Sequence, residues 1–421
     1  MPAELITPVI RRRIVATIFA VSSLVSAAQI AYFTLTSIIA ADISGTDSLA
    51  GVPGTLSMVG RALSAYPVGW LMGRAGRRYG LSLGLLFGLI GTLVSAWAIG
   101  TGSFWMFSIG AGLAGAARGA ADLGRYAAAE VYPPESRARA LGLVVFAGTI
   151  GAIVGPLLVV PSTEAAATFG WPAESGPYLI GAVFSAMSIL LTLLFLRPDP
   201  MVLSKQYEPE EVKGEGEAGA GQGRTFRQLL TLDNVRLGMA AMVIGQLVMV
   251  MIMVITPLHM SHAGHDTGAI SLVIMAHTLG MFGLSTVTGR LIDRIGSESV
   301  IIIGAVLLIG ASIMSPFVAT VSGLAIALFL LGLAWNLCFI AGSSLLASGL
   351  GTNERGRVQG SSDTLASAAA ALGSLSTGPL FAAGTFILVG AVGLALSLGL
   401  FAASFILRPR KIFPKISDGS Y

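Results

Sequence analysis

The sequence predicts an all-α integral membrane protein whose twelve transmembrane helices form two pseudo-symmetric six-helix bundles. Three observations predict it: an apolar composition, twelve long apolar stretches, and a set of motifs that recurs halfway along the chain. Of the 421 residues, 54% are hydrophobic and 11% are charged, whereas a soluble domain carries about 25% charged residues. The chain therefore lacks the polar surface that a globule in water needs, and lipid is the solvent that suits it.

The apolar stretches have the length of membrane-spanning helices, which need about 20 apolar residues each. The single cysteine, Cys338, falls inside the tenth stretch, which excludes an intramolecular disulfide framework. The twelve stretches are 14–40, 48–72, 79–99, 103–127, 141–161, 176–196, 237–257, 268–288, 298–318, 322–345, 358–381 and 385–407.

Basic residues set the orientation. If both termini are cytoplasmic, all but three of the 25 Lys and Arg residues fall in cytoplasmic segments, and those three (Arg61, Arg118 and Arg125) lie within helices. This is the positive-inside bias of a protein of the cell inner (cytoplasmic) membrane. The net charge of +4 thus reports membrane topology and not nucleic-acid binding. The first apolar stretch is too long for a signal-peptide core, so we expect it to be retained as a spanning helix.

A polar segment divides the chain into two halves. Residues 197–236 include the Gly- and Glu-rich stretch "EPEEVKGEGEAGAGQG", whose composition cannot bury a core. The predicted organisation is therefore an N-terminal bundle at 1–196, a cytoplasmic linker at 197–236 and a C-terminal bundle at 237–421.

Motifs of the first half recur in the second, 217 to 223 residues later. The charged turn "GWLMGRAGRRYG" at 69–80 is followed by "GRLIDRIGSESV" at 289–300, each between the second and third helices of its half. The pairs "SRARALG" and "ERGRVQG", "GPLL" and "GPLF", Gln29 and Gln246, and Arg118 and Asn336 keep the same order. Such an internal repeat in parallel orientation is the architecture of a secondary transporter that rocks one half against the other.

At these residues the sequence resembles the major facilitator superfamily, whose signature between helices two and three is G-x-x-x-D-R-x-G-R-R. The aspartate position holds Gly73, and the family's arginine of the fourth helix is replaced by Gly110. "GTIGAIVGP" in the fifth helix resembles the G-x-x-x-G-P motif of the superfamily's antiporters and favours export. The matching residues are Gly69, Arg74, Gly76, Arg77 and Arg78 in the first copy and Gly289, Asp293, Arg294 and Gly296 in the second.

The resemblance implies that the charged turn latches the two halves on the cytoplasmic side. Glycines allow helix ends to approach closely, and arginines can pair there with carboxylates or helix C-termini. The alternative is that the arginines only anchor the topology. We expect a latch because anchoring does not require glycine at fixed positions, and Asp363 is the candidate partner of Arg74 or Arg77.

Charged residues deep in the membrane are candidates for function because their insertion costs about 2.5–3.5 kcal/mol each. Arg118, Asp122 and Arg125 share one face of the fourth helix, and Arg61 lies within the second. The resemblance implies that helices one, four, seven and ten line a central cavity. Arginine forks suit carboxylates and phosphates, so an anionic or zwitterionic substrate is favoured. The alternatives are a self-contained Arg118–Asp122 pair and an Arg125 that reaches toward the cytoplasm.

Polar side chains on the implied cavity helices extend the candidate binding site. Gln29, Gln246 and Asn336 are predicted to contact substrate, with interhelical hydrogen bonding as the alternative. For proton coupling the candidates are Asp122, a carboxylate deep in the N-terminal half, and His277, whose imidazole titrates near neutral pH. His277 has helix packing as its alternative. His259, His262 and His265 lack a completing ligand, so no metal and no cofactor is predicted.

These observations predict a monomeric secondary active transporter of a small solute, coupled to protons and embedded in the lipid bilayer. The sequence contains no P-loop and no nucleophile–base pair, so no enzymatic activity is predicted. The first alternative is a drug or amphiphile exporter with a neutral or cationic substrate. The second is a non-transporting membrane sensor or scaffold, for which the polar segment is too short to form a soluble domain.

Overall fold

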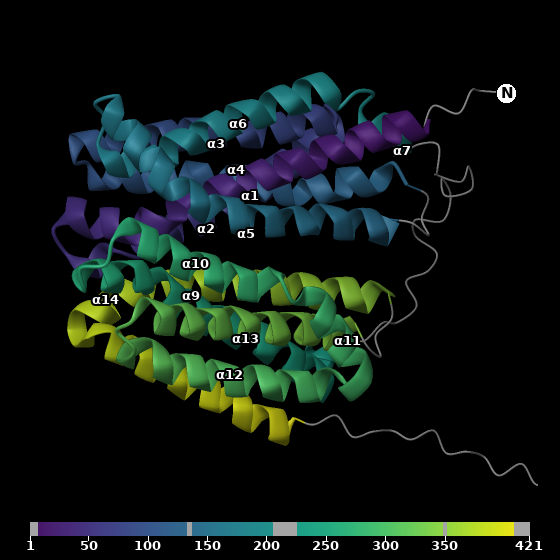
Figure 1. Ribbon diagram of the computed structural model, residues 1–421. Coiled ribbons are helices and arrows are strands. Elements are labelled where there is room, and N and C mark those ends of the chain that lie inside the picture. Colours follow the sequence, from purple (N-terminus) through teal and green to yellow (C-terminus); the bar gives the residue numbers. More distant parts are fainter. Residues whose placement is uncertain (1–6, 133–136, 205–224, 348–351, 408–421) are drawn as a thin grey trace, which may run out of the picture.

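Long helices lie side by side in a single elongated bundle (Figure 1). The computed structural model describes residues 7–132, 137–204, 225–347 and 352–407, and every regular element within these ranges is a helix. The first helix begins and the last helix ends at the same end of the bundle, here called the terminal end (Figure 1). The opposite end is called the far end. These features confirm the predicted all-α fold class.

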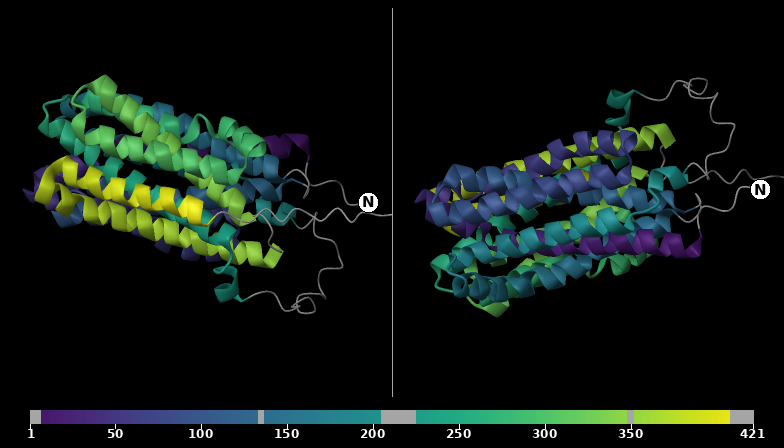
Figure 2. Two further views of the ribbon diagram at one scale, coloured as in Figure 1. Left: turned by 90° about the horizontal axis from the view of Figure 1, so that it is seen from below. Right: turned by 90° about the horizontal axis from the view of Figure 1, so that it is seen from above.

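The helices of the first half pack mainly on one another, and from above they cover the near face of the bundle (Figure 2). Helix α1 starts with Pro8 at its first turn and the Thr7 hydroxyl as its N-cap. The elements are α1 (Pro8–Ser44), η1 (Asp47–Leu49), α2 (Val52–Arg74), α3 (Arg77–Thr101), α4 (Phe104–Glu130), α5 (Arg137–Thr168), η3 (Ala173–Ser175) and α6 (Gly176–Phe195).

The second half repeats this arrangement with two irregular helices. One span is broken at Gly283 and Leu284, between α10 and α11. Helix α14 contains non-helical backbone at Gly384 and Thr385, so it consists of two helical spans. Helices α7 (Pro200–Ser204) and α8 (Phe226–Leu229) lie in the predicted linker, and the elements of the second half are α9 (Asp233–His262), α10 (Thr267–Phe282), α11 (Ser285–Ile295), α12 (Ser297–Phe317), α13 (Val321–Ala347) and α14 (Thr352–Ile406).

Nine segments of the described residues are long and apolar enough to cross a membrane. Helices α2 and α4 are of similar length but fall outside this set, and they are the helices that carry Arg61, Arg118, Asp122 and Arg125. With these two helices included and the two spans of α14 counted separately, the structure is consistent with the twelve predicted spans.

The segment predicted to be a linker, 197–236, lies partly outside the described residues, which omit 205–224. Its beginning packs on the first half, because α7 contacts α3 and α4 and Leu203 is buried. Near its end, Leu229 is buried in a cluster with residues of α9, α13 and α14. Apolar side chains therefore extend the packed bundles into the predicted linker from both sides.

Glycines bring α2 and α4 into backbone contact. A Cβ atom on Gly60 would lie 1.8 Å from the Gly112 carbonyl oxygen, and one on Gly115 would lie 2.0 Å from the Ser57 carbonyl oxygen. Small residues allow this approach, and helices in lipid associate largely through such packing. The contact fixes the position of Arg61, the residue after Gly60, relative to α4.

We expect Gly60→Ala to destabilise the protein, because the added methyl group meets backbone that cannot move without separating α2 from α4. Overpacking typically costs about 1–3 kcal/mol, which a lower unfolding temperature in detergent would reveal. Gly73→Ala is the matched control in the same helix, since a Cβ atom there meets nothing within 4 Å. Equal unfolding temperatures for the two variants would contradict this packing.

The two halves meet at the far end. The Ser374 hydroxyl of α14 donates to the Gly51 carbonyl (2.8 Å), and the Thr55 hydroxyl of α2 donates to the Ala371 carbonyl (3.3 Å). Beside them His262 Nε2 of α9 lies 3.6 Å from Asp47 Oδ1 of η1. These contacts close the bundle at this end.

Toward the terminal end, the same two helices expose large or charged residues. Arg61 and Tyr66 on α2 are exposed, as are Asp363 and Leu365 on α14. The Thr55–Ala371 contact sets an antiparallel register that places Arg61 opposite the turn of α14 that holds Asp363. The structure is thus closed at the far end and open at the terminal end.

Candidate functional site

A triad of charged side chains lies near the middle of α2 and α4. Arg61 Nη2 is 2.6 Å from Asp122 Oδ2, and Arg118 Nε is 3.1 Å from Asp122 Oδ1. One carboxylate therefore holds two guanidinium groups from two helices. The predicted i,i+4 pair of Arg118 and Asp122 is present, but it is not self-contained because Arg61 completes it.

Helix α1 supplies a third side of this triad. Arg118 Nη1 donates to the Ser26 hydroxyl (2.6 Å). The G-x-x-x-G-P motif of α5 explains why α1 lies close, because a Cβ atom on Gly151 would be 2.3 Å from the Ser26 Cβ and one on Gly155 would be 2.8 Å from the Ala27 carbonyl oxygen. The motif thus presses α5 against α1 beside the residue that orients Arg118.

The triad remains open to solvent and electropositive. Side chains of Arg61, Asp122 and Arg118 are 51%, 29% and 24% exposed. Two guanidinium groups face one carboxylate, which leaves an excess positive charge in a partly exposed site. Arg125 stands slightly apart, donating to the Tyr126 hydroxyl (3.1 Å) and covering its ring. That geometry fits an arginine reaching toward the membrane surface.

The charged turn after α2 has partners other than the predicted one. Arg77 makes a two-pronged pair with Glu130 at the end of α4, through Nε (3.0 Å) and Nη2. Asp199 accepts the backbone N–H groups of Arg77 and Arg78 (3.0 Å each) and so caps α3. Glu130 and Asp199 were missed, although both are acidic residues beside the basic cytoplasmic segments.

Gly76 is required by this cap. Its φ of +103° is a conformation that L side chains rarely adopt, and a Cβ atom there would lie 2.5 Å from Asp199 Oδ2. Gly296 takes the equivalent place before α12, with φ +83° and ψ 154° against φ +103° and ψ 160° at Gly76. The repeated turn therefore has the same backbone in both halves. In the second copy, Asp293 and Arg294 are exposed and Gly289 has open space around it.

The predicted pairing of Asp363 with Arg74 or Arg77 is not formed in this conformation. Arg74 covers the Trp70 ring, 4.6 Å from its centroid. The charges that act on Asp363 are those of Arg125 and Arg61. The antiparallel register of α2 and α14 explains this, because it places Arg74 about eleven residues, or roughly 16 Å, nearer the terminal end than Asp363.

We expect Arg77→Gln to destabilise the protein by about 1.5–3 kcal/mol, since hydrogen bonds to charged groups contribute in that range. The reason is that Glu130 loses a two-pronged partner in a largely buried place. Unfolding in detergent measures the effect, and the Arg77→Gln, Glu130→Gln double variant should lose less than the sum of the two single variants. Arg78→Gln is the control, because the Arg78 side chain covers only the Tyr79 ring among the contacts described for it. Additive single-variant losses would contradict the pair.

The remaining predicted site residues divide into two groups. Gln29 and Gln246 are partly exposed near the middle of α1 and α9. Asn336 is buried: its side chain donates to the Met281 carbonyl (2.6 Å) and the Ser285 hydroxyl (2.9 Å) and accepts from Thr288 (2.6 Å). Asn336 thus forms hydrogen bonds with residues on both sides of the break between α10 and α11 and does not face the cavity.

His277 is also fully buried, with Nδ1 hydrogen-bonded to the Leu328 carbonyl (2.9 Å). This geometry fits the packing alternative. The three histidines near the far end have separate partners: His262 meets Asp47, His265 meets the Ala319 carbonyl (3.1 Å), and His259 packs on the Phe386 ring.

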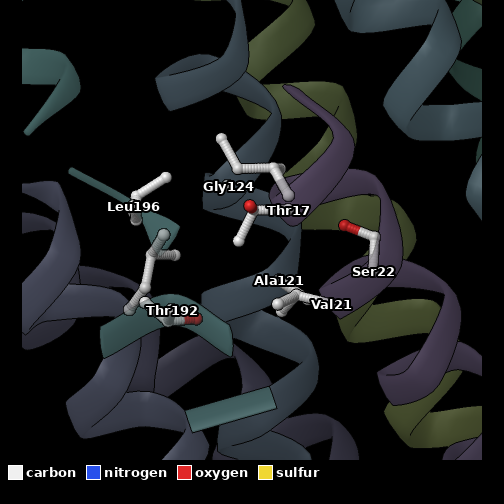
Figure 3. A pocket seen from close by; sticks show the side chains of 9 residues that line it. Thr17, Val21, Ser22, Ala121, Gly124, Thr192 and Leu196 are labelled. Atoms are coloured by element: carbon white, nitrogen blue, oxygen red, sulfur yellow. The ribbon is translucent and has the colours of Figure 1, made fainter. Parts of the chain in front are cut away.

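A small pocket lies inside the first half, lined by residues of α1, α3, α4 and α6 (Figure 3). Thr17 and Thr192 point into it, but their hydroxyl groups donate to carbonyls of their own helices. Ala121 and Gly124 bring no charge from α4. Ser22 also lines the pocket, and its hydroxyl is buried with no hydrogen-bond partner among the described residues. The pocket is thus a small and mainly apolar gap behind the charged triad.

Comparison with known proteins agrees with the fold and the repeated turn. The family model described as Major Facilitator Superfamily matches residues 17–374 and 268–415. The chain belongs to the major facilitator superfamily. Its members are transporters, so this multi-pass chain is a transporter of the superfamily and the predicted family is confirmed.

Relatives and solved structures cover most of this superfamily chain. It is 34% identical over 369 residues to the uncharacterized MFS-type transporter YdeG of Bacillus subtilis, covering 87% of this chain and 85% of the relative. It is 30% identical over 338 residues to the riboflavin transporter RfnT of Brucella anthropi, covering 80% and 81%. Crystal structures of a D-xylose-proton symporter (TM-score 0.70, 16% identity, 94% and 98% covered) and of the human organic anion transporter MFSD10 (0.64, 17%, 94% and 100%) share the fold.

Proposed function

We propose that this transporter couples protons to the movement of an anionic or zwitterionic small solute, with Asp122 as the proton carrier and Arg61 and Arg118 as the substrate-binding cations. One observation carries the proposal: Asp122 holds both guanidinium groups in a site open to solvent. Gln29 and Gln246, at the middle of α1 and α9, are proposed as further substrate contacts.

The triad links the binding of a proton to the binding of the solute. When Asp122 is ionised, it occupies both arginines. When it is protonated, its charge is gone and the two forks are released for an anionic group, which they bind through charge-assisted hydrogen bonds. A proton on Asp122 and an anion on the arginines therefore favour one another, which is the thermodynamic requirement for symport of the proton and the anion.

Gating is proposed to involve the turn at 69–80 and its repeat. In the present conformation Glu130 and Asp199 hold this turn to the first half alone. Closure at the terminal end would bring the turn toward the second half, where Asp363, Asp293 and Arg294 are exposed. Asp363→Asn then raises cysteine labelling of positions at the terminal end of the cavity.

A second candidate function is export of a neutral or cationic amphiphile. Two observations favour it: Asp122 already neutralises part of the arginine charge, and the G-x-x-x-G-P motif packs α5 on α1 beside the triad. In that case the arginines would serve only to hold Asp122 in place, and the substrate would be drawn to the carboxylate.

The test is solute flux into proteoliposomes under an imposed pH gradient, with matched organic acids, amides and amines. The proposal expects the acids to accumulate, and to do so only while the gradient lasts. Best accumulation of the amines supports the second candidate. Acid accumulation that is indifferent to the pH gradient contradicts proton coupling.

A further inference from the structure

The second half presents a cluster of aromatic rings on α10 and α13. Trp335 and Phe339 of α13 are stacked, with ring centroids 5.0 Å apart and planes 21° from parallel. Phe282 at the end of α10 meets Trp335 edge-on at 6.1 Å. All three side chains are partly exposed and not buried in the core. We call Phe282, Trp335 and Phe339 the aromatic wall.

The neighbours of α13 show which way the wall faces. Cys338 points toward α9 and α12, since it approaches Gly245 and Gly304. Gly332 and Asn336 point toward α10, where they meet His277 and Met281. At 100° per residue, Trp335 and Phe339 lie on the face between these two directions. The wall therefore lines the space between α9 and α10, inside the bundle.

The side-chain NH₂ group of Gln246 on α9 is available to a ligand. The indole N–H of Trp335 donates to Gln246 Oε1 (2.7 Å). An indole N–H only donates, so the amide oxygen of Gln246 must face it, and the amide NH₂ points elsewhere. Among the contacts of the described residues, this NH₂ has no acceptor. A donor thus stands at the edge of the aromatic wall.

The wall and the triad lie at the same depth. Trp335 is near the middle of α13 and Gln246 near the middle of α9, as Arg118 and Asp122 are near the middle of α4. Helix α1, which supplies Ser26 to Arg118, contacts α9 directly. The two halves therefore contribute different chemistry to one level: fixed positive charge from the first, flat apolar rings and an amide donor from the second.

We propose that the transported solute carries a planar aromatic or heteroaromatic ring beside its anionic group. The ring stacks on the wall, with Gln246 donating to a carbonyl or ring nitrogen at its edge, while the anionic group takes the place of Asp122 on Arg61 and Arg118. This inference rests on the proposed function, because it assigns the anion to the triad. It adds the chemical class of the part of the solute that lies beside the anionic group.

A saturated solute gains less from this wall. Aromatic rings prefer offset-stacked or edge-on partners and gain from them beyond the burial of area. An aliphatic ring of the same size covers the wall but has no such electronic preference. The proposal thus predicts discrimination between two acids of equal charge and similar shape.

The test is calorimetric titration of the full chain in lipid nanodiscs with 2-naphthoate, 2-naphthamide and decahydro-2-naphthoate. We expect 2-naphthoate to bind about tenfold more tightly than its saturated counterpart. Trp335→Leu should remove this ratio by weakening 2-naphthoate alone, and Phe339→Leu should reduce it, which gives a second variant if the first fails to fold. Trp105→Leu is the control, since Trp105 is exposed at the far end of α4.

The outcomes separate the two proposals. Equal binding of the aromatic and saturated acids, in wild type, overturns the aromatic inference and leaves the anionic substrate standing. Binding of 2-naphthamide as tight as that of 2-naphthoate contradicts the anionic substrate, while a Trp335-dependent ring preference would still support the wall. Failure of 2-naphthoate to bind at millimolar concentrations overturns the ring-and-anion class.

Discussion

Asp122→Asn is expected to abolish accumulation of the solute under a pH gradient while sparing exchange of the solute down its own gradient. Asparagine has nearly the shape of protonated aspartic acid, but its amide neither releases nor binds a proton at the pH values on the two sides of the membrane. The variant therefore resembles a carrier locked in its protonated form. Because Arg61 and Arg118 lose their shared counter-charge, the site should also bind an anion without waiting for a proton.

Proteoliposomes measure both parts of this prediction, with gradient-driven uptake in one assay and counterflow of labelled solute in the other. The control is Glu164→Gln, a carboxylate exposed on α5 toward the far end. It should behave like wild type in both assays. If Asp122→Asn still concentrates the solute, Asp122 is not the carrier, and His277 and Asp363 become the residues to test.

The helices and the charged turn could be predicted because each rests on local sequence. Lipid demands a run of apolar residues for each span, and a turn with glycine at fixed positions records its backbone requirement, as Gly76 and Gly296 show with their positive φ. The internal repeat also indicated that the two halves have equivalent arrangements of helices. None of these inferences needed knowledge of which helices touch.

The partners of charged residues could not be predicted in the same way. Arg77 meets Glu130 and not Asp363, because the crossing of α3 with α4 and the register of α2 against α14 decide which carboxylate is in reach. Spacing on one helix placed Arg118 beside Asp122, but the arrival of Arg61 depends on the glycine contact between α2 and α4.

Two polar residues at matching places also turned out to differ in environment. Arg118 and Asn336 correspond in the repeat, and both are polar side chains in the middle of a helix. Arg118 belongs to the partly exposed triad, whereas Asn336 forms hydrogen bonds beside the break between α10 and α11. A sequence repeat fixes depth in the membrane, but a break in a neighbouring helix creates unsatisfied backbone groups that only the folded structure reveals.

The second large effect is expected at Arg61. Arg61→Lys should weaken binding of an anionic solute, because lysine keeps the positive charge but loses the planar fork that matches a carboxylate. Arg61→Gln removes the charge and should weaken binding by about 10- to 100-fold, the range that corresponds to 1.5–3 kcal/mol for hydrogen bonds to charged groups. Calorimetric titration of the solute that accumulates best gives the dissociation constants.

Arg61 is the informative residue of the triad because its loss affects anionic and cationic solutes in opposite directions. It removes a cation from the substrate, and it also releases Asp122 from one of its two ion pairs. An anionic solute is harmed by both changes, whereas a cationic solute gains an unoccupied carboxylate. Arg125→Gln serves as the matched control, since Arg125 bonds to Tyr126 and lies outside the triad. If Arg61→Gln binds an amine more tightly than wild type does and leaves the acid unchanged, the substrate is a cation held by Asp122, and the arginines serve to position that carboxylate.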